Sequence, residues 1–133
     1  MESQNSRTGI VLFAHGSRVE EANEGVRLLA KQVQDSGGFA RVRAAFLELG
    51  QPDLKGAIAE AVGAGIHRII VMPYFLTLGV HLRRDLPELL ARERESHPGV
   101  EFIVSEPLDG HPAMPSLVAE RIRAVSEIGG PPR

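Results

Sequence analysis

Cysteine and tryptophan are both absent from this chain of 133 residues, and long apolar runs are missing as well. The absence of cysteine excludes disulfide bonds, zinc–thiolate sites and thiol catalysis, so any metal site must use histidine and carboxylate side chains. No apolar run approaches the ~20 residues of a bilayer-spanning helix, and the polar start MESQNSRTG is not typical of a signal segment. We therefore expect a cytoplasmic protein without a membrane partner.

A surplus of one charge is also missing. The chain carries 15 Lys and Arg against 17 Asp and Glu, without a basic run, and its formal net charge is −2. This balance does not favour nucleic acid or a membrane surface as a partner. The G-x-x-x-x-G-K-[ST] loop, a G-x-G-x-x-G turn behind the first strand and the G-x-S-x-G elbow are absent too. Nucleotide hydrolysis and dinucleotide binding are therefore without support.

Short apolar runs alternate with helical patterns along the whole chain. Residues 10–14 are apolar without alternation, which is typical of a strand buried on both faces of a parallel sheet. Further strands are predicted at 40–47, 68–72 and 100–104, each followed by residues with helical spacing. Strands joined through helices in this way indicate right-handed crossovers and a parallel sheet with helices on both faces.

The predicted fold is α/β, with three layers and a four-stranded parallel sheet in the order 2-1-3-4 flanked by helices. We expect a single domain at 9–128, between a flexible N-terminus at 1–8 and a flexible tail at 129–133. The strand order places the topological switch between the first and third strands. The turns behind those two strands should therefore face one crevice.

Local signals predict how three of the helices begin or pack. Ser17 and Glu20 form an S-x-x-E capping box, so the first helix should begin directly behind the first strand. The third helix is expected to begin at Asp85, with Asp85 and Glu88 in capping positions and Pro87 in the first turn. The last helix is expected to turn an apolar face inward, made of Met114, Leu117, Val118, Ile122 and Val125.

Histidine and glutamate follow three of the predicted strands. His15 closes the first strand, Glu48 closes the second, and His81 lies in the segment behind the third. Two imidazoles and one carboxylate can bind a divalent first-row metal and leave positions open for water or substrate. Taken alone, each residue also fits a plainer role, because such histidines are often hydrogen-bonded turn residues and such glutamates are usually solvated. His111, behind the fourth strand, fits either a turn former or a pocket wall.

Arginines and a mostly apolar loop lie close to these residues in the sequence. Arg83 and Arg84 follow His81, and Arg18 lies beside the first histidine turn. A guanidinium can bind a carboxylate in bidentate geometry, although exposed arginines are usually solvated or paired with acids such as Asp85. The loop behind the third strand suits a pocket wall for a large flat ligand, or a subunit contact, through Tyr74, Phe75, Leu76, Thr77 and Leu78.

Several ordered motifs match a known family: VLFAHGSR, AFLELGQPD, VMPYFLTLGVHLRRDLP and PLDGHP. Together they resemble the short, single-domain sirohydrochlorin chelatases, cobalt- or iron-inserting relatives of the class II chelatases. The resemblance covers about 9–128, nearly the whole chain. It implies a chelatase-like half-lobe that inserts a divalent metal into sirohydrochlorin without ATP, on the route to cobalamin or sirohaem.

The resemblance also implies roles for single residues. By position, His15 of A-H-G-S, Glu48 of F-L-E and His81 of G-V-H-L-R-R-D correspond to metal-binding and catalytic residues of similar proteins. The metal, Co²⁺ or Fe²⁺, is then a substrate, and no tightly bound cofactor is expected. Short members are expected to form homodimers. The residues expected to bind the substrate are Arg83, Arg84, Arg18, Tyr74, Phe75, Thr77 and His111.

Other functions stay open at this point. A non-catalytic carrier of metal or tetrapyrrole would use the same residues for binding alone. A phosphatase would use the strand–histidine–glycine turn, but Ala14 replaces the arginine of the R-H-G signature. A nickel-inserting chelatase is a further alternative, although the histidine-rich insertion of some archaeal relatives is absent. The sequence does not decide between cobalt and iron, because affinity at such a site follows the metal series and supply as well as the ligands.

Overall fold

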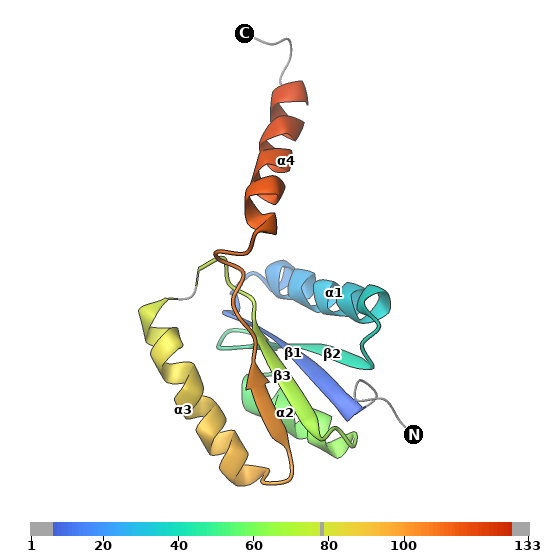
Figure 1. The fold of residues 1–133 in the computed structure, drawn as a ribbon, viewed down its shortest axis with the longest axis vertical. Helices are drawn as coiled ribbons and strands as arrows, with labels where there is room; N and C mark the ends of the chain where they lie inside the picture. Colours follow the sequence, from blue (N-terminus) through green and yellow to red (C-terminus); the bar gives the residue numbers. More distant parts are fainter. Residues whose placement is uncertain (1–6, 78, 129–133) are drawn as a thin grey trace.

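The computed structural model describes residues 7–77 and 79–128, and its strands form one parallel sheet in the order β2-β1-β3-β4 (Figure 1). The predicted α/β fold and strand order are therefore confirmed. β1 begins at a buried Thr8 and so reaches into the segment predicted to be flexible, while 1–6, Leu78 and 129–133 lie outside the described residues. The strands are β1 (Thr8–Ala14), β2 (Arg41–Phe46), β3 (Arg68–Pro73) and β4 (Glu101–Val104).

Helices cover both faces of the sheet. α1 (Glu20–Gly37) lies on one face, and α2 (Leu54–Gly63) and α3 (Val80–Ser96) lie on the other (Figure 1). Successive residues of β1 serve both layers, because Leu12 packs in the core cluster of α1 and Phe13 in that of α2 and α3. Burial on two faces explains why β1 is a continuous apolar run and not an alternating one.

Two predicted helix starts are wrong. The N-cap of α1 is Val19, and it makes no side-chain capping bond. The Ser17 hydroxyl accepts a hydrogen bond from the Val19 N–H (3.0 Å), so the expected capping box does not form. α3 begins at Val80, behind an extended Gly79, and not at Asp85.

Packing explains the early start of α3. Leu86 and Leu90 are buried in the core, and Leu82 packs against it one turn earlier. This apolar stripe draws the turn before the predicted start into the helix. Pro87 consequently lies past the first turn, where it removes one N–H from the helix ladder. His81 lies on the first helical turn and not in a loop.

α4 (Ala113–Ile128) differs most from the prediction, because it stands away from the sheet (Figure 1). Its apolar face lines a hollow of about 840 Å³ together with Leu76, so the predicted periodicity is present. The face is exposed, however, so the prediction that it turns inward is wrong. Among the described residues, no helix is long and apolar enough to cross a membrane. Met114 is half-buried, and the following residues are 51–70% exposed: Leu117, Val118, Ile122 and Val125.

Candidate functional site

His15 lies in the turn between β1 and α1, at the carboxyl edge of the sheet. Gly16 follows it with a φ of +96°, and a Cβ atom there would lie 1.7 Å from the Glu48 carbonyl oxygen. Any other residue would both strain the backbone and collide with the neighbouring turn. The Glu48 N–H also donates to the His15 carbonyl (3.1 Å). The turns behind β1 and β2 are therefore in direct contact.

The His15 and Glu48 side chains meet at this contact. Nε2 of His15 lies 3.5 Å from Oε2 of Glu48, and the two side chains are 59% and 55% exposed. A cation can therefore reach an imidazole nitrogen and a carboxylate oxygen directly from solvent. The expectation that these two side chains share one edge of the sheet is met.

His81 faces the same cavity as His15. The cavity has a volume of about 610 Å³ and lies between the loops behind β1, β2 and β3 and the face of α3 from His81 to Arg92. Within 7–77 and 79–128, no group of three His, Asp or Glu side chains is arranged to hold a metal ion. The structure thus pairs His15 with Glu48 and places His81 elsewhere on the cavity wall, so the expected ligand trio is not assembled.

A polar stripe on α3 forms one wall of the cavity. His81, Asp85, Glu88 and Arg92 all line it, and their spacing of four, three and four residues is that of one helix face. The start at Val80 makes the expected capping roles of Asp85 and Glu88 wrong. With that start known, the stripe can be found in the sequence. It adds two carboxylates and one cation to the cavity.

The arginines predicted to bind carboxylates are exposed and differ in their contacts. Nη2 of Arg84 lies 3.2 Å from Nδ1 of His81, and its Nε lies 3.8 Å from Oδ1 of Asp85. Arg84 is therefore coupled to the polar stripe of its own helix. Arg83 lies beside it on α3, and Arg18 lies in the turn before α1.

The loop behind β3 supplies an aromatic wall. Phe75 lines the cavity and packs edge-to-face on Phe13, with ring centroids 6.3 Å apart. Tyr74 and Thr77, in the same loop, are exposed. His111 lies elsewhere, at the start of α4, where its Nδ1 accepts a hydrogen bond from the Ala113 N–H (2.9 Å). Of its two predicted roles, the turn former is the one observed.

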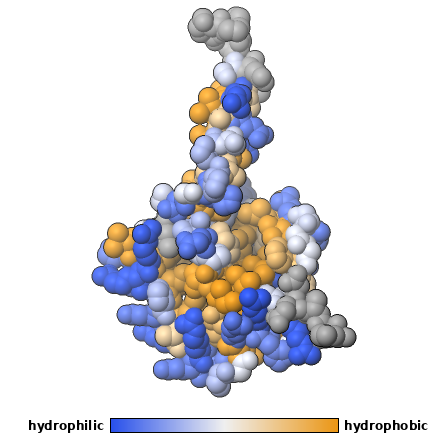
Figure 2. Space-filling view, viewed as in Figure 1, coloured by the Kyte–Doolittle hydropathy of each residue, from blue (hydrophilic) through white to orange (hydrophobic). Residues whose placement is uncertain are grey.

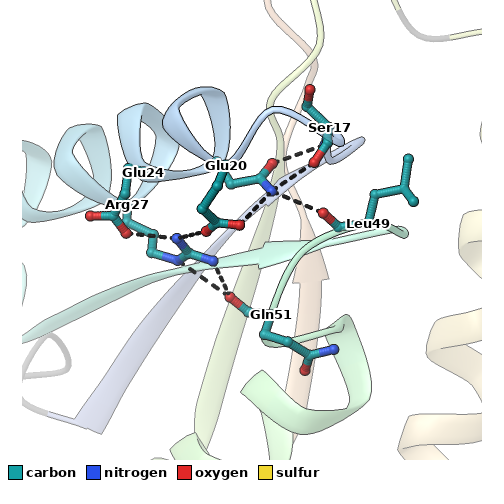
Figure 3. Close-up of polar contacts among 7 residues, drawn as sticks. Ser17, Glu20, Glu24, Arg27, Leu49 and Gln51 are labelled. Carbon is teal, nitrogen blue, oxygen red and sulfur yellow. Dashed lines mark hydrogen bonds and ion pairs between the residues drawn. The ribbon is translucent and has the colours of Figure 1, made fainter.

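Asn23 of α1 joins the two turns and was not among the predicted site residues. Its side chain is 1% exposed and hydrogen-bonds Ser17 behind β1 and Leu49 behind β2 (Figure 3). A signal for it exists in the sequence, because Asn23 interrupts the apolar stripe of α1 between Ala22 and Val26. A polar residue in a buried stripe needs buried hydrogen-bond partners.

A charged cluster on α1 supports the turn behind β2. The Arg27 guanidinium donates to Glu20 and Glu24 (2.6 Å each) and to the Gln51 carbonyl (2.8 Å; Figure 3). It also lies 5.2 Å from the Phe46 ring centroid. Hydrogen bonds from Arg27, and then from Asn23, hold the pKa of Glu20 below its usual value of 4.5. The two carboxylates in turn raise the pKa of Arg27.

Relatives of similar length match almost the whole chain. The sirohydrochlorin cobaltochelatase of Methanopyrus kandleri is 31% identical over 86% of this chain and 94% of its own length. That of Methanococcoides burtonii is 30% identical over 91% and 98%. The chloroplastic sirohydrochlorin ferrochelatase of Arabidopsis thaliana is longer, and its match, 32% identical over 86% of this chain, covers 51% of its length.

Solved structures give the same picture of one short and one longer relative. The CbiX protein from Marinobacter aquaeolei VT8 superposes with a TM-score of 0.78 at 31% identity, covering 90% of this chain and 98% of that chain. SirB from Bacillus subtilis subspecies spizizenii, solved in complex with cobalt, superposes with a TM-score of 0.82. Its identity is 24%, which shows the fold alone, and the match covers 51% of that chain. Since the CbiX family model also matches residues 9–125, this chain belongs to the CbiX family.

Proposed function

We propose that this chain inserts a divalent metal, Co²⁺ or Fe²⁺, into sirohydrochlorin, as a step in cobalamin or sirohaem biosynthesis. The metal is a substrate, and neither ATP nor a tightly bound cofactor takes part. Relatives named sirohydrochlorin cobaltochelatase and ferrochelatase, 30% to 32% identical, support the proposal. The observation that carries it is the pairing of His15 with Glu48 at 3.5 Å, beside a cavity that His15 shares with His81. A cytoplasmic location stays a prediction.

The chemistry of insertion suits these side chains. The macrocycle must lose two pyrrole protons while the metal exchanges its water ligands for ring nitrogens. An imidazole can bind the metal and can also accept a proton near neutral pH, and a carboxylate can balance the charge. We assign metal delivery to His15 and His81, with proton uptake by one of them, and we assign charge balance and proton removal to Glu48.

The carboxylates of the macrocycle need cations around the cavity. We assign them to Arg83, Arg84 and Arg18, and we add Arg92 because it lines the cavity itself. Arg84 already contacts His81, so a substrate carboxylate bound there would lie close to one of the proposed metal ligands. Contacts to the face of the ring are assigned to the loop residues Tyr74, Phe75 and Thr77.

An anaerobic absorbance time course of sirohydrochlorin with excess Co²⁺, Fe²⁺ or Ni²⁺ tests the proposal. The full chain is compared with its His15→Ala and His81→Ala variants and with a blank without protein. His67→Ala is the matched control, because His67 is exposed and precedes β3 at the opposite edge of the sheet. We expect multiple turnovers with the full chain and the control, and loss of most turnover in both site variants.

Two outcomes would contradict this proposal. At most one metallated ring per site, without acceleration over the blank, would favour the carrier. Near-normal rates in both site variants would remove His15 and His81 from the mechanism. The relative rates with cobalt, iron and nickel decide which metal the chain prefers.

We propose further that the chain works as a homodimer. It spans about half the length of the Arabidopsis ferrochelatase and of SirB, so two copies would supply the two halves of such a molecule. Two of its own apolar surfaces also support a second copy as the partner. One is the exposed face of α4, and the other lies on the sheet.

The apolar surface on the sheet lies beside α1. α1 packs on β1 and β2, whereas α2 and α3 share the opposite face. On the α1 side of β3 and β4, Ile70, Met72 and Ile103 are half-buried. Figure 2 shows this apolar area over the strands, below α4. Among the described residues, the α1 side of the sheet thus has space for one more helix, and α4 is an amphipathic helix without a packing partner.

Reciprocal docking of α4 on the partner's sheet would cover both surfaces. α4 has 16 residues. A helix of that length is about 24 Å long and about 10 Å wide, so each docked helix covers about 240 Å². The dimer has two symmetric contacts, and each buries one helix surface and one sheet surface. The total buried area is then roughly 1,000 Å², the lower end for a specific interface. A single docked helix would bury half of that, which favours the reciprocal arrangement.

The cysteine-free sequence allows a clean cross-linking test. Ile103→Cys on the sheet and Val118→Cys on α4 are made in separate chains, mixed, and treated with a short bismaleimide. We expect a mixed cross-linked dimer, together with a dimeric mass of the untreated chain in sedimentation. Lys31→Cys, on the exposed side of α1, controls for collisions. A monomeric chain, or Val118→Cys chains that cross-link only to each other, would contradict reciprocal docking.

A further inference from the structure

We infer that Asn23 is a positioning residue that couples the His15 turn to the Glu48 turn and thereby sets the metal affinity of the pair. The inference rests on the proposed function, because it takes His15 and Glu48 as the residues that receive the metal. Asn23 lies on α1, contacts neither side chain in the described hydrogen bonds, and is 1% exposed. Its influence on the metal would therefore act through the backbone of the two turns.

Both ends of the Asn23 amide form hydrogen bonds. Oδ1 accepts a hydrogen bond from the Ser17 N–H (2.9 Å), and Nδ2 donates to the Ser17 carbonyl (2.9 Å) and to the Leu49 carbonyl (2.9 Å). One side chain thus binds the residue two positions after His15 and the residue directly after Glu48. Only an amide of this size supplies an acceptor and two donors at once.

The Glu48 turn adopts a backbone conformation that needs such support. Leu49 has a φ of +59°, in the left-handed region that non-glycine residues rarely occupy. This conformation directs the Leu49 carbonyl at α1, where Asn23 receives it. A Cβ atom on Gly50 would lie 3.1 Å from Nδ2 of Asn23 and 2.8 Å from the Phe46 ring, so the turn passes close to the amide. The Asn23 contact therefore favours a strained loop directly beside a proposed metal ligand.

The two turns also bind each other, but through the backbone alone. The Leu47 N–H donates to the Ala14 carbonyl (2.9 Å), and the Glu48 N–H donates to the His15 carbonyl (3.1 Å). These bonds continue the β1–β2 ladder and fix where the turns begin. Asn23 holds the far ends of the two turns, because it hydrogen-bonds Ser17 after His15 and Leu49 after Glu48. Loss of Asn23 should leave the sheet intact and widen the spread of His15–Glu48 distances around 3.5 Å.

Direct metal titration tests the coupling without requiring turnover. Co²⁺ is titrated into the full chain and into Asn23→Leu, which keeps the approximate volume and deletes the three hydrogen bonds to the turns together with the weaker one to Glu20 (3.4 Å). Asn23→Asp is the second variant, because it keeps the shape and the acceptor but loses the donors to the two carbonyls. Removing an outer-shell partner of a metal ligand typically costs about 10- to 100-fold in affinity, and we expect a loss in that range for both variants.

A double-mutant cycle separates positioning from general damage to the fold. In a Glu48→Gln background, Asn23→Leu should weaken Co²⁺ binding by less than about 2-fold, because the ligand that it positions is already gone. Arg27→Met is the matched control. Arg27 lies one turn along α1 and holds the Gln51 carbonyl further down the same loop (2.8 Å), so its loss should lower thermal stability and change Co²⁺ affinity by less than about 3-fold.

The outcomes distinguish this inference from the proposed function. If Asn23→Leu lowers the Co²⁺ affinity equally with and without Glu48→Gln, the coupling is overturned. It is also overturned if neither Asn23 variant changes the Co²⁺ affinity. A chain that shows the coupling but does not metallate sirohydrochlorin would refute the proposed function alone. If Co²⁺ binding to the full chain does not depend on His15, both the coupling and the proposed function are refuted.

Discussion

Two regions of the molecule differ in where their contacts come from. One is the sheet edge with His15 and Glu48, and the other is the helix α4. At the sheet edge, backbone bonds between the turns and the buried Asn23 amide all lie within one chain. On α4, Ile122 and Val125 are 62% and 70% exposed, and the apolar face lines a hollow together with Leu76. The His15–Glu48 pair, which we propose receives the metal, is thus preformed in a single copy, whereas the apolar face of α4 stays exposed in the described part of the chain, and we propose that a second copy covers it.

The largest effect is expected from charges on α4. The double variant Ile122→Glu/Val125→Glu places carboxylates in the proposed apolar contact, where burial without partners is costly. We expect the dimer to weaken at least about 100-fold, measured by sedimentation over a range of concentrations. The circular dichroism of the domain should be unchanged, because these side chains are exposed within one chain.

Glu120→Gln is the control for that experiment, since Glu120 is on α4 but does not line the hollow. It should leave the dissociation constant of the dimer unchanged. A double variant that dimerises as well as the parent chain would remove the difference between the two regions, because α4 would then need no partner.

A large effect on the preformed edge is expected from Gly16→Ala. The new Cβ would lie 1.7 Å from the Glu48 carbonyl oxygen at a φ of +96°. The substitution should lower the free energy of unfolding in urea by about 3 kcal/mol, through both the collision and the left-handed backbone. Gly38→Ala separates the two causes, because Gly38 has a φ of +73° but no neighbour within 4 Å of the added atom. Its cost should be about 1 kcal/mol; equal costs would show that the turns yield to each other.

A moderate effect is expected from the arginines at the cavity. Arg83→Ala/Arg84→Ala removes two exposed cations that we assign to substrate carboxylates. The KM for sirohydrochlorin should rise about 10-fold while kcat stays within about 2-fold, because uniform binding is lost and chemistry is not. Lys31→Ala, which removes an exposed cation from α1, should change neither constant. A fall in kcat alone would instead indicate that Arg84 acts on His81.

The smallest effect concerns the acid side of stability. The pKa of Glu20 is lowered by its hydrogen bonds to Arg27 and then Asn23, so its ionised form stabilises the fold above pH 4.5, and that contribution is lost as the pH falls through the lowered pKa. Glu20→Gln should therefore melt slightly below the parent chain at pH 7, and the difference between the two melting temperatures should shrink as the pH falls below 4.5. A difference that does not shrink with falling pH would indicate a role of Glu20 other than its charge.

The position of His81 is predicted by the sequence only in part. Its position behind β3 correctly predicts that it faces the same cavity as His15. Its position on a helix depends on Leu82, because Leu82 packs on the core and so extends α3 toward its N-terminus, as far as Val80. Local capping signals point to Asp85 instead, because the side chains there are typical of helix starts whether or not a core lies nearby.

The sequence by itself determined the strands, their order and the position of His15 and Glu48 at one edge of the sheet. These follow from short-range patterns and from the handedness of crossovers, which need no knowledge of particular neighbours. Only the tertiary structure decided the start of α3, the contacts of Asn23 and the exposure of α4. Periodicity predicts that an apolar helix face is covered, but the residues that cover it lie far away in the chain or, as we propose for α4, in a second molecule.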